Sequence, residues 1–530
     1  MKGILNHLVS TARSFPAPIA DIILTEKNFA EHIARVSGIL IKHSGAMGWL
    51  VYDKKKGIYI SGNRAEKIVN LYIGEMAKTL AASAMDIRES AKRESVVKFA
   101  IKILTASGAA HIISLLKNEI EIDALPEEFD AAPDIVNCCG LAASANGGTR
   151  EAAPSDMFTK TTVCRPEPGT PERFLAYIDW VTCGDSEEKE WLMTTLSLSL
   201  FGHVSDKIIN FYGQGGNGKG TTCRVIYHIL KDYAVSLPRS LVVKSNHGTG
   251  RFDKANLPGK RGAFCFDLKL EPGERLNLDD LKSICGNGDV ISIEKKHLDS
   301  FDAVLHCKIF IASNEKIPVS ATGESERRRF HLVPFNARIE EKDETLEDSF
   351  IPEYPRILNL LLEYAARYYA NGRKMPPCKA IDLATGRFFD SQDLVGLFIQ
   401  DRCTVADGYV IPKTELFMAY ANYLETEQGI KRPGKTRVFA ESLEKRGIFE
   451  SVKKIEGNAK RVFVGITLGE VTRLQKDPNF HITFSGETNI ETNTNSRLFC
   501  NRVTQGDGNP VKYNSPEQKK LWEDPEKAIY

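Results

Sequence analysis

The sequence predicts a parallel α/β core with a phosphate-binding loop, preceded by a mostly helical region and followed by a small unit of helices and a hairpin. From Lys207 to Arg373, short apolar runs alternate with segments of helical spacing, which is typical of a parallel sheet with crossover helices. A glycine-rich turn near the start of this stretch has the spacing G-x-x-x-x-G-K. Beyond residue 376, helical segments precede two strand-like runs, Phe449–Ile455 and Lys460–Leu468, and this order is that of a winged helix.

The chain divides by pattern into five stretches. A length of 530 residues agrees with about three or four domains. In the first stretch, Trp49–Ile60 alternates apolar residues around a basic turn that ends in glycine, which indicates a hairpin. We expect a mostly helical amino-terminal domain, an irregular connector with a helical collar, the α/β core, a winged-helix domain and a polar tail, at residues 1–125, 126–200, 201–373, 376–470 and 471–530.

Composition restricts the partners and the compartment. The chain has 70 Lys and Arg residues against 69 Asp and Glu residues, so a nucleic acid would have to be held by local basic patches. Its 11 Cys residues form no C-x-x-C pair and no Cys/His ligand spacing, which predicts reduced thiols. There is no secretory signal and no run of about 20 apolar residues, so we expect a soluble, cytoplasmic protein without a membrane partner.

The phosphate-binding loop joins an apolar strand, Lys207–Tyr212, to a helix from Thr221 onward. Such a turn aims backbone N–H groups and the positive end of the helix at phosphates, and Lys219 would reach the β- and γ-phosphates. Where Ser or Thr ordinarily holds Mg²⁺ the residue is Gly220, and Thr221 lies about 100° further around the helix, which leaves its role as a Mg²⁺ ligand open. We expect ATP here, in contact with Gly213, Gly215, Gly216, Asn217, Gly218, Lys219, Gly220 and Thr221.

Two further strands of the core end in polar residues. One ends at Asp267, the candidate Mg²⁺ ligand. Because Leu268 follows it, no acidic pair supplies a catalytic base, which is left open between Asp267 and Glu271; a solvated loop carboxylate is the alternative for Glu271. The other strand ends at Asn314, whose amide would orient the attacking water or contact the γ-phosphate, or would merely form a turn.

Taken in order, these motifs are familiar. NGKG, the acid-ended strand, LKSICGNGD, IEKK, SN-x-x-IP and RRRF-x-x-VPF together resemble the superfamily 3 helicases, and more closely the phage and plasmid primase–helicase family shared with poxvirus-type replicative helicases. The segments DIVNCCGLAASANGG and GDSEEKEWLMTTLSLSLFG and the winged helix extend this resemblance from about Trp49 to Leu468. Members of this family carry both NGKS and NGKG forms, so the resemblance implies that Gly220 is a tolerated variant.

The resemblance implies an AAA+ P-loop ATPase core that assembles as a homo-oligomer, a hexameric ring, with ATP and Mg²⁺ at each subunit interface. It assigns phosphate contact to Lys219, the Walker B acid to Asp267, sensor 1 to Asn314, and an arginine finger, acting in a neighbour's site, to Arg328 or Arg329. A central-channel hairpin that tracks single-stranded DNA would carry Lys295, Lys296 and His297.

The chain departs from this family in two ways. The glutamate that usually follows the Walker B strand does not align, and too few residues precede the matching segment for a primase domain, so a separate primase or polymerase would be a partner. In the winged helix, a basic set would grip duplex or forked DNA, with a protein-contact wing as the alternative: Lys435, Arg437, Lys453, Lys454, Lys460 and Arg461.

We therefore interpret the sequence as an ATP-dependent replicative DNA helicase of a phage, plasmid or mobile element, acting in a bacterial host cell and travelling 3′ to 5′ as the family does. Two other hypotheses stay open. One is a DNA-remodelling AAA+ ATPase that does not separate strands. The other is an origin-binding initiator or scaffold, in which Gly220 and Leu268 reflect lost turnover.

Overall fold

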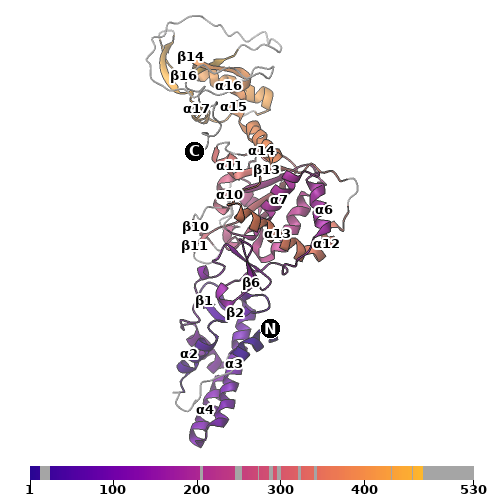
Figure 1. Ribbon diagram of the computed structural model, residues 1–530. Helices are drawn as coiled ribbons and strands as arrows, with labels where there is room; N and C mark the ends of the chain where they lie inside the picture. The colour runs from indigo at the N-terminus through magenta and orange to yellow at the C-terminus, as the bar shows by residue number, and fades with distance from the viewer. Residues whose placement is uncertain are drawn as a thin grey trace, which may run out of the picture. The chain divides into compact units, whose positions relative to one another are not determined.

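The computed structural model separates the chain into two compact units, residues 1–397 and residues from Phe398 onward (Figure 1). The residues described are 1–11, 24–202, 207–244, 253–271, 274–285, 290–294, 300–319, 324–339, 343–430, 433–455 and 458–469. The expected tail at 471–530 and the channel residues Lys295, Lys296 and His297 lie outside them.

The amino-terminal part of the first unit packs helices around a small antiparallel sheet. The sheet has the order β1-β2-β3, with Val51 of β2 paired to Ile60 of β3 across the turn predicted from the sequence. Apolar side chains of all these elements form one core. The elements are α1 (Lys2–Thr11), α2 (Glu26–Ser37), β1 (Ile41–Ser44), β2 (Gly48–Asp53), β3 (Ile58–Ile60), α3 (Asn63–Ser83), α4 (Ser90–Ile103) and α5 (Ala106–Leu116).

The connector contains a second small sheet, which the sequence analysis describes only as irregular. Its strands pair antiparallel in the order β4-β5-β6 and are at most four residues long, too short to leave a clear alternation in an Ala- and Gly-rich sequence. Two helices follow and pack against the core. The elements are β4 (Ile135–Cys138), β5 (Leu141–Ser144), β6 (Thr149–Glu151), α6 (Glu172–Val181) and α7 (Ser186–Ser197).

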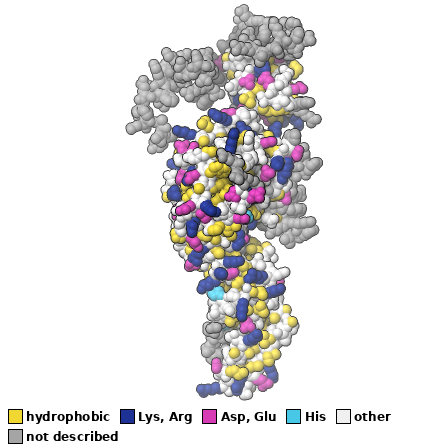
Figure 2. All heavy atoms as spheres, turned by 90° about the vertical axis from the view of Figure 1, so that its right-hand side faces the viewer, with side chains coloured by type: hydrophobic (Ala, Val, Ile, Leu, Met, Phe, Trp, Pro, Cys, Tyr) yellow, Lys and Arg dark blue, Asp and Glu magenta, His cyan; other side chains and the backbone are white. Residues whose placement is uncertain are grey.

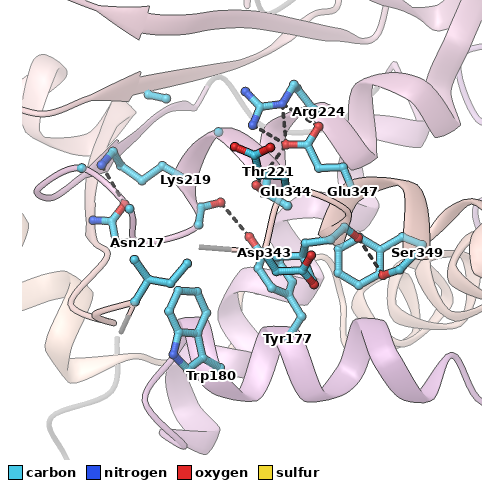
Figure 3. A pocket seen from close by; sticks show the side chains of 18 of the residues that line it. Tyr177, Trp180, Asn217, Lys219, Thr221, Arg224, Asp343, Glu344, Glu347 and Ser349 are labelled. Atoms are coloured by element: carbon cyan, nitrogen blue, oxygen red, sulfur yellow. Dashed lines mark hydrogen bonds and ion pairs between the residues drawn. The ribbon is translucent and has the colours of Figure 1, made fainter. Parts of the chain in front are cut away.

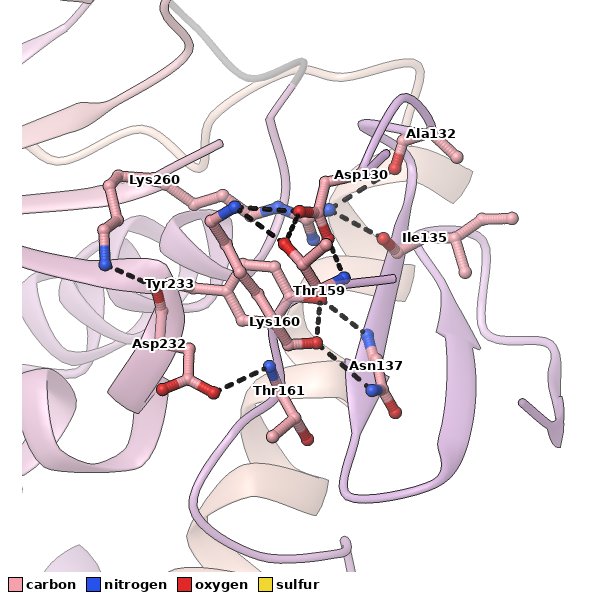
Figure 4. A network of polar contacts seen from close by, with 11 residues as sticks. Asp130, Ala132, Ile135, Asn137, Thr159, Lys160, Thr161, Asp232, Tyr233 and Lys260 are labelled. Carbon is pink, nitrogen blue, oxygen red and sulfur yellow. Dashed lines mark hydrogen bonds and ion pairs between the residues drawn. The ribbon is translucent and has the colours of Figure 1, made fainter. Parts of the chain in front are cut away.

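Asn137, at the centre of this connector, joins three parts of the first unit, and Figure 4 shows its bonds to Lys160 and Tyr233. Its buried side-chain amide donates to the carbonyl oxygens of Lys56 (2.9 Å) and Gly57 (3.2 Å) in the β2–β3 turn, and to that of Lys160 (3.1 Å). Its backbone N–H donates to the hydroxyl of Tyr233, which lies beside the core sheet. These bonds fix the amino-terminal hairpin to the core through one residue.

The core is a parallel sheet of five strands in the order β13-β7-β12-β9-β8. Apolar clusters cover both of its faces, as the near-continuous apolar sequence of the strands predicts. Because the strands run in one direction, their carboxyl ends share one edge of the sheet. The strands are β7 (Ile208–Tyr212), β8 (Ala234–Ser236), β9 (Gly262–Leu268), β12 (Lys308–Ser313) and β13 (Phe330–Pro334).

Helices connect and cover these strands, and one antiparallel ribbon projects from the chain between β9 and β12. The ribbon pairs β10 (Val290–Ile293) with β11 (Phe301–Val304), and the expected channel residues fall between these two strands. The helices of the core are α8 (Lys219–Leu230), α9 (Arg239–Val242), α10 (Leu278–Ile284), α11 (Glu324–Arg329), α12 (Leu346–Ser349), α13 (Tyr354–Ala370) and α14 (Lys379–Gln392).

Helix α14 belongs to the first unit, although the sequence analysis groups its residues with 376–470. Phe388 stacks on Phe330 of β13 with ring centroids 5.2 Å apart, and the Thr385 hydroxyl accepts a bond from the Leu332 amide at 3.1 Å. The compact second unit starts within α15 (Leu394–Arg402).

The second unit packs helices on a three-stranded antiparallel sheet of order β14-β16-β15. Strand β14 has no counterpart in the sequence analysis. Gly408 lies in its middle with φ +91°, and the pairing register shifts there, so the strand lacks a regular alternation. The elements after α15 are β14 (Cys403–Pro412), α16 (Lys413–Gln428), α17 (Thr436–Glu444), β15 (Glu450–Ile455) and β16 (Asn458–Leu468).

Candidate nucleotide-binding site

The glycine-rich turn runs from the end of β7 into the first turn of α8 and requires glycine at two positions in particular. Gly218, which caps α8, has φ +88°, and a Cβ there would lie 2.7 Å from the Tyr177 hydroxyl oxygen. Gly213 has φ +158°, and a Cβ there would lie 2.4 Å from the Phe335 carbonyl oxygen. The turn is therefore held close to α6 on one side and to the end of β13 on the other.

Lys219 is almost fully buried beneath this turn, and its ammonium group donates to three oxygens of the turn itself. The partners of Nζ are the carbonyl oxygens of Gly213 (2.6 Å) and Gln214 (2.9 Å) and Oδ1 of Asn217 (2.8 Å). An ammonium group has three donors, so all are used. Burial lowers the pKa of Lys219, and the negative charge of Asp267 opposes that shift. The Asn217 amide in turn donates to Phe335 O at 2.7 Å, which ties the turn to β13.

Asp267 and Asn314 meet at the carboxyl edge of the sheet, beside the glycine-rich turn. β9 and β12 are neighbours, and the Asn314 amide nitrogen lies 3.5 Å from Oδ1 of Asp267. The Asp267 side chain is 63% exposed, and its backbone has φ +48°, which is unusual for a residue other than glycine. Both residues line the same cavity as Lys219. Glu271 does not line it, and its backbone N–H donates instead to the Glu274 carboxylate at 2.6 Å.

Gly220 and Thr221 contact a pair of charged residues that the sequence analysis does not name (Figure 3). Arg224 lies one turn along α8, and its guanidinium is 2.9 Å from where a Cβ on Gly220 would be. The same guanidinium binds both carboxylate oxygens of Glu347 through Nε, at 2.7 and 2.8 Å. The Thr221 hydroxyl also donates to Glu347, at 3.1 Å. The hydrogen bond from Arg224 holds the pKa of Glu347 below its ordinary value.

The cavity has a volume of about 1220 Å³ and extends from the glycine-rich turn to a wall formed by α6 and α12. Tyr177 and Trp180, one turn apart on α6, line it (Figure 3). The Tyr177 hydroxyl donates to Gly218 O at 2.7 Å and lies 2.8 Å from Thr222 Oγ1, and burial raises its pKa. This wall is hard to predict from the sequence because its residues are far from the turn in the chain. The aromatic i,i+3 pair ahead of β7 is the one available signal.

The three arginines of α11 lie at the other edge of the sheet. β13 runs parallel to β7, pairing Phe330 with Ile208 and Pro334 with Tyr212, so α11 precedes the strand end that is remote from the glycine-rich turn. Arg327 binds Asp390 of α14 at 2.9 Å and lies over the Phe389 ring. The side chain of Arg328 is exposed and that of Arg329 is half-buried. Neither lines the cavity.

The basic residues expected to contact DNA in the second unit do not share one face. In the β15–β16 pair, Lys453 is opposite Lys460, while Val452 is opposite Arg461. Side chains alternate along a strand, so Lys453 and Lys460 face one side of the sheet, and Lys454 and Arg461 face the other. On and beside α17, Lys435 is exposed and Arg437 pairs with Glu441 at 2.8 Å.

The described residues include no group of three or more His, Cys, Asp or Glu side chains arranged to hold a metal ion. No single helix among them is long and apolar enough to cross a membrane, and the bent pair α4 and α5, at 86°, passes the same test only when both are taken together.

Comparison with known proteins adds a family match within the core. A family of unknown function (DUF5906) matches residues 211–329, from the glycine-rich turn to the arginines of α11. No curated protein matches the sequence significantly.

Three solved structures of the NrS-1 C terminal region are similar to the chain. The A form apo structure has 14% identity and a TM-score of 0.42, covering 80% of this chain and 95% of that one. A second A form apo structure, of residues 305–718, has 13% identity and a TM-score of 0.42, with 83% and 99% covered. A further apo structure of the same region has 13% identity and a TM-score of 0.43, again with 83% and 99% covered.

Proposed function

We propose that this protein is an ATP-dependent DNA helicase with an AAA+ core of the superfamily 3 type, a motor of phage, plasmid or mobile-element replication. The observation that carries the proposal is the meeting of Lys219, Asp267 and Asn314 around one cavity at the carboxyl edge of a parallel sheet. Ligands of open parallel sheets bind at that edge. A buried cation, a carboxylate and an amide are the groups that phosphoryl transfer from a nucleotide requires.

The residues present are suited to ATP and Mg²⁺. The positive-φ glycines and the start of α8 offer backbone N–H groups to phosphates, and Lys219 would add a positive charge beside them. Asp267 and Asn314 present oxygens of the kind that Mg²⁺ prefers. When bound, Mg²⁺ would neutralise charge on the phosphates. Asn314 would orient the attacking water, and the aromatic wall of α6 would exclude bulk water.

The position of the arginines supports an oligomer. Arg328 is exposed at the edge of the sheet opposite the glycine-rich turn of its own chain. The five-residue strand β13 separates Arg328 from the edge that carries that turn by about 15 Å. It would therefore reach a γ-phosphate only in another copy of the chain, and a closed ring gives every copy such a neighbour. The β10–β11 ribbon would carry the expected DNA-tracking residues Lys295, Lys296 and His297 into the channel of that ring.

The test is ATP-dependent unwinding of forked DNA with 3′ or 5′ tails, together with ATP hydrolysis. Arg328→Ala should lower hydrolysis by about 10³-fold or more, since it removes charge stabilisation in the neighbour's site. The matched control is Arg327→Ala, which breaks a bond to Asp390 within one chain and should leave hydrolysis within a few-fold of wild type. Mixing inactive Arg328→Ala with inactive Asp267→Asn should restore part of the activity. Equal effects of the two arginine variants would contradict the proposal.

A second candidate is a nucleotide-binding scaffold or initiator without turnover. Two observations favour it: Gly220 provides no hydroxyl for Mg²⁺, and Glu271, the alternative base, lies outside the cavity. ATP binding by wild type without hydrolysis, in the presence of forked DNA, would select it. Hydrolysis without unwinding would select a DNA-remodelling ATPase.

A further inference from the structure

The basic turn of the amino-terminal hairpin has no role in the proposed motor, yet it lines a pocket of its own. The pocket has a volume of about 510 Å³ and is formed by the first turns of α1, the β2–β3 turn and the start of α3. Lys54 and Lys55 come from the turn, Arg64 from α3 and His7 from α1. Lys67 is exposed one turn beyond Arg64, on the same side of α3. We refer to Lys54, Lys55, Arg64 and Lys67 as the amino-terminal basic patch.

The patch differs from several other basic residues of this region, which form ion pairs with acids. Lys27, Lys78 and Lys98 each form an ion pair with a glutamate on the same helix, at 3.8, 2.8 and 2.6 Å. Within the part of the chain that the structure describes, no side chain of the patch forms an ion pair or hydrogen bond.

One acid, Asp53, also lines this pocket. Asp53 accepts the backbone N–H of Lys55 at 3.0 Å, which shapes the turn. Burial and then the charge of Lys54 lower the pKa of His7, so the positive field of the patch extends into the pocket. Three of the four cations, Lys54, Lys55 and Arg64, line this hollow beside a single carboxylate, that of Asp53. The net positive charge makes an electrostatic site for an anion with several charges.

We propose that the amino-terminal basic patch binds the backbone phosphates of nucleic acid, as a contact separate from the ring channel. The choice of nucleic acid among polyanions rests on the proposed function. The described residues that line the pocket include no Phe, Tyr or Trp side chain to stack on a base. Its contacts would therefore position the strand without reading its sequence.

The hairpin also has a rigid connection to the motor. The carbonyl oxygens of Lys56 and Gly57, directly after the two lysines of the patch, accept hydrogen bonds from Asn137. A strand held at the patch is thus held at a fixed position relative to the connector and the core sheet. Figure 2 shows Lys and Arg side chains on the visible face of the amino-terminal part, the lowest part of the first unit.

The experiment measures binding of a fluorescein-labelled 20-nucleotide single strand by anisotropy, without nucleotide, at several salt concentrations. The test variant of the full chain is Lys54→Glu/Lys55→Glu/Arg64→Glu. The control, Lys27→Glu/Lys78→Glu/Lys98→Glu, makes the same change in charge in the same region. All six side chains are exposed, so both variants should fold, and circular dichroism and thermal melting verify this.

The test variant should bind the strand at least about tenfold more weakly at low salt. A plot of the logarithm of its binding constant against the logarithm of the salt concentration should have a slope shallower by about 2, as expected for three lost phosphate contacts on a single strand. The control should stay within about twofold of wild type. Equal affinity and slope in the two variants would overturn the inference, as would the absence of DNA binding by wild type. Preferential loss of binding to inorganic phosphate or to phosphatidylserine vesicles, with DNA binding kept, would also overturn it. If wild type binds DNA but does not unwind it, the proposed function fails while the comparison of the variants still decides this inference.

Discussion

Replacement of two glycines, two residues apart, should have very different consequences for the stability of the candidate site. Gly218→Ala places a Cβ 2.7 Å from the Tyr177 hydroxyl, 3.0 Å from Val181 Cγ2 and 3.2 Å from the Trp180 ring, at a backbone φ of +88°. The left-handed conformation costs a non-glycine residue about 1–2 kcal/mol. Displacement of packed side chains on α6 adds about 1–3 kcal/mol. The variant should therefore lose about 2–5 kcal/mol of stability in the core.

Gly220→Ala meets a different obstacle. Its Cβ would lie 2.9 Å from Arg224 Nη1, the far end of a flexible side chain. Moving that guanidinium weakens a half-exposed pair with Glu347, worth at most about 1 kcal/mol. Alanine in a helix regains about 1 kcal/mol over glycine. The net change should lie within about 1 kcal/mol of zero.

The assay is urea unfolding followed by intrinsic tryptophan fluorescence, because Trp180 borders the turn and Trp191 lies in the same apolar cluster. Gly218→Ala should shift this transition to markedly lower urea, and Gly220→Ala should not. A fluorescent ATP analogue provides the second measurement: its affinity should fall for Gly218→Ala. Similar midpoints for the two variants would refute the reasoning, since it depends on a fixed obstacle in one case and a movable one in the other.

Three further predictions follow from buried polar groups. Asn137→Ala leaves the carbonyl oxygens of the β2–β3 turn without their donor, so the amino-terminal part should become several-fold more sensitive to limited proteolysis while the core stays resistant; unchanged digestion would contradict this. Burial and the nearby charge of Asp185 raise the pKa of Glu188 from 4.5 to about 7, so its ionisation destabilises the folded state as pH rises from about 4.5 to 7. Glu188→Gln should therefore stabilise the protein by about 2 kcal/mol at pH 8 and not at pH 4. Scanning fluorimetry would show this as a higher melting temperature at pH 8 only. Tyr177→Phe removes a bond of 2.7 Å to Gly218 O and should cost about 1–2 kcal/mol and weaken binding of the ATP analogue, whereas unaltered affinity would show that the bond does not order the turn.

The parts of the candidate site that are contiguous in the chain can be predicted from sequence, because neighbouring residues determine them. The strand, glycine-rich turn and helix follow from glycine spacing and from where apolar runs begin and end, and parallel strands bring Asp267 and Asn314 to the same edge. The wall of the cavity depends on tertiary contacts instead. Tyr177 bonds a residue 41 positions away, and Arg224 bonds Glu347 over 123 positions. An acidic run such as that around Glu347 is ordinarily a solvated surface, so its sequence carries no sign of this contact.

Fold prediction fails where the local pattern is weak. β14 has a positive-φ glycine and a register shift in its middle, which destroy the alternation that marks a strand. The boundary near residue 376 is drawn from a proline pair, but α14 beyond it packs on β13 through Phe388 and Phe330. Such packing depends on which apolar faces meet in three dimensions, and a change of composition along the sequence does not indicate it.

The contacts of Lys219 affect how an inactive form of this protein should be made. Its ammonium group donates one hydrogen bond to each of three oxygens, which would face one another without it. Truncation of that side chain therefore removes these three hydrogen bonds as well as a positive charge. The backbone around Gly213 and Gln214 would then have to rearrange to separate or hydrate the oxygens. Asp267, exposed and without such a bracing role, is the better position for an inactivating substitution, since Asp267→Asn leaves the turn supported while changing the chemistry. For the same reason the proposed binding of a phosphate would be an exchange, in which the anion competes with the protein's own carbonyl groups for the lysine.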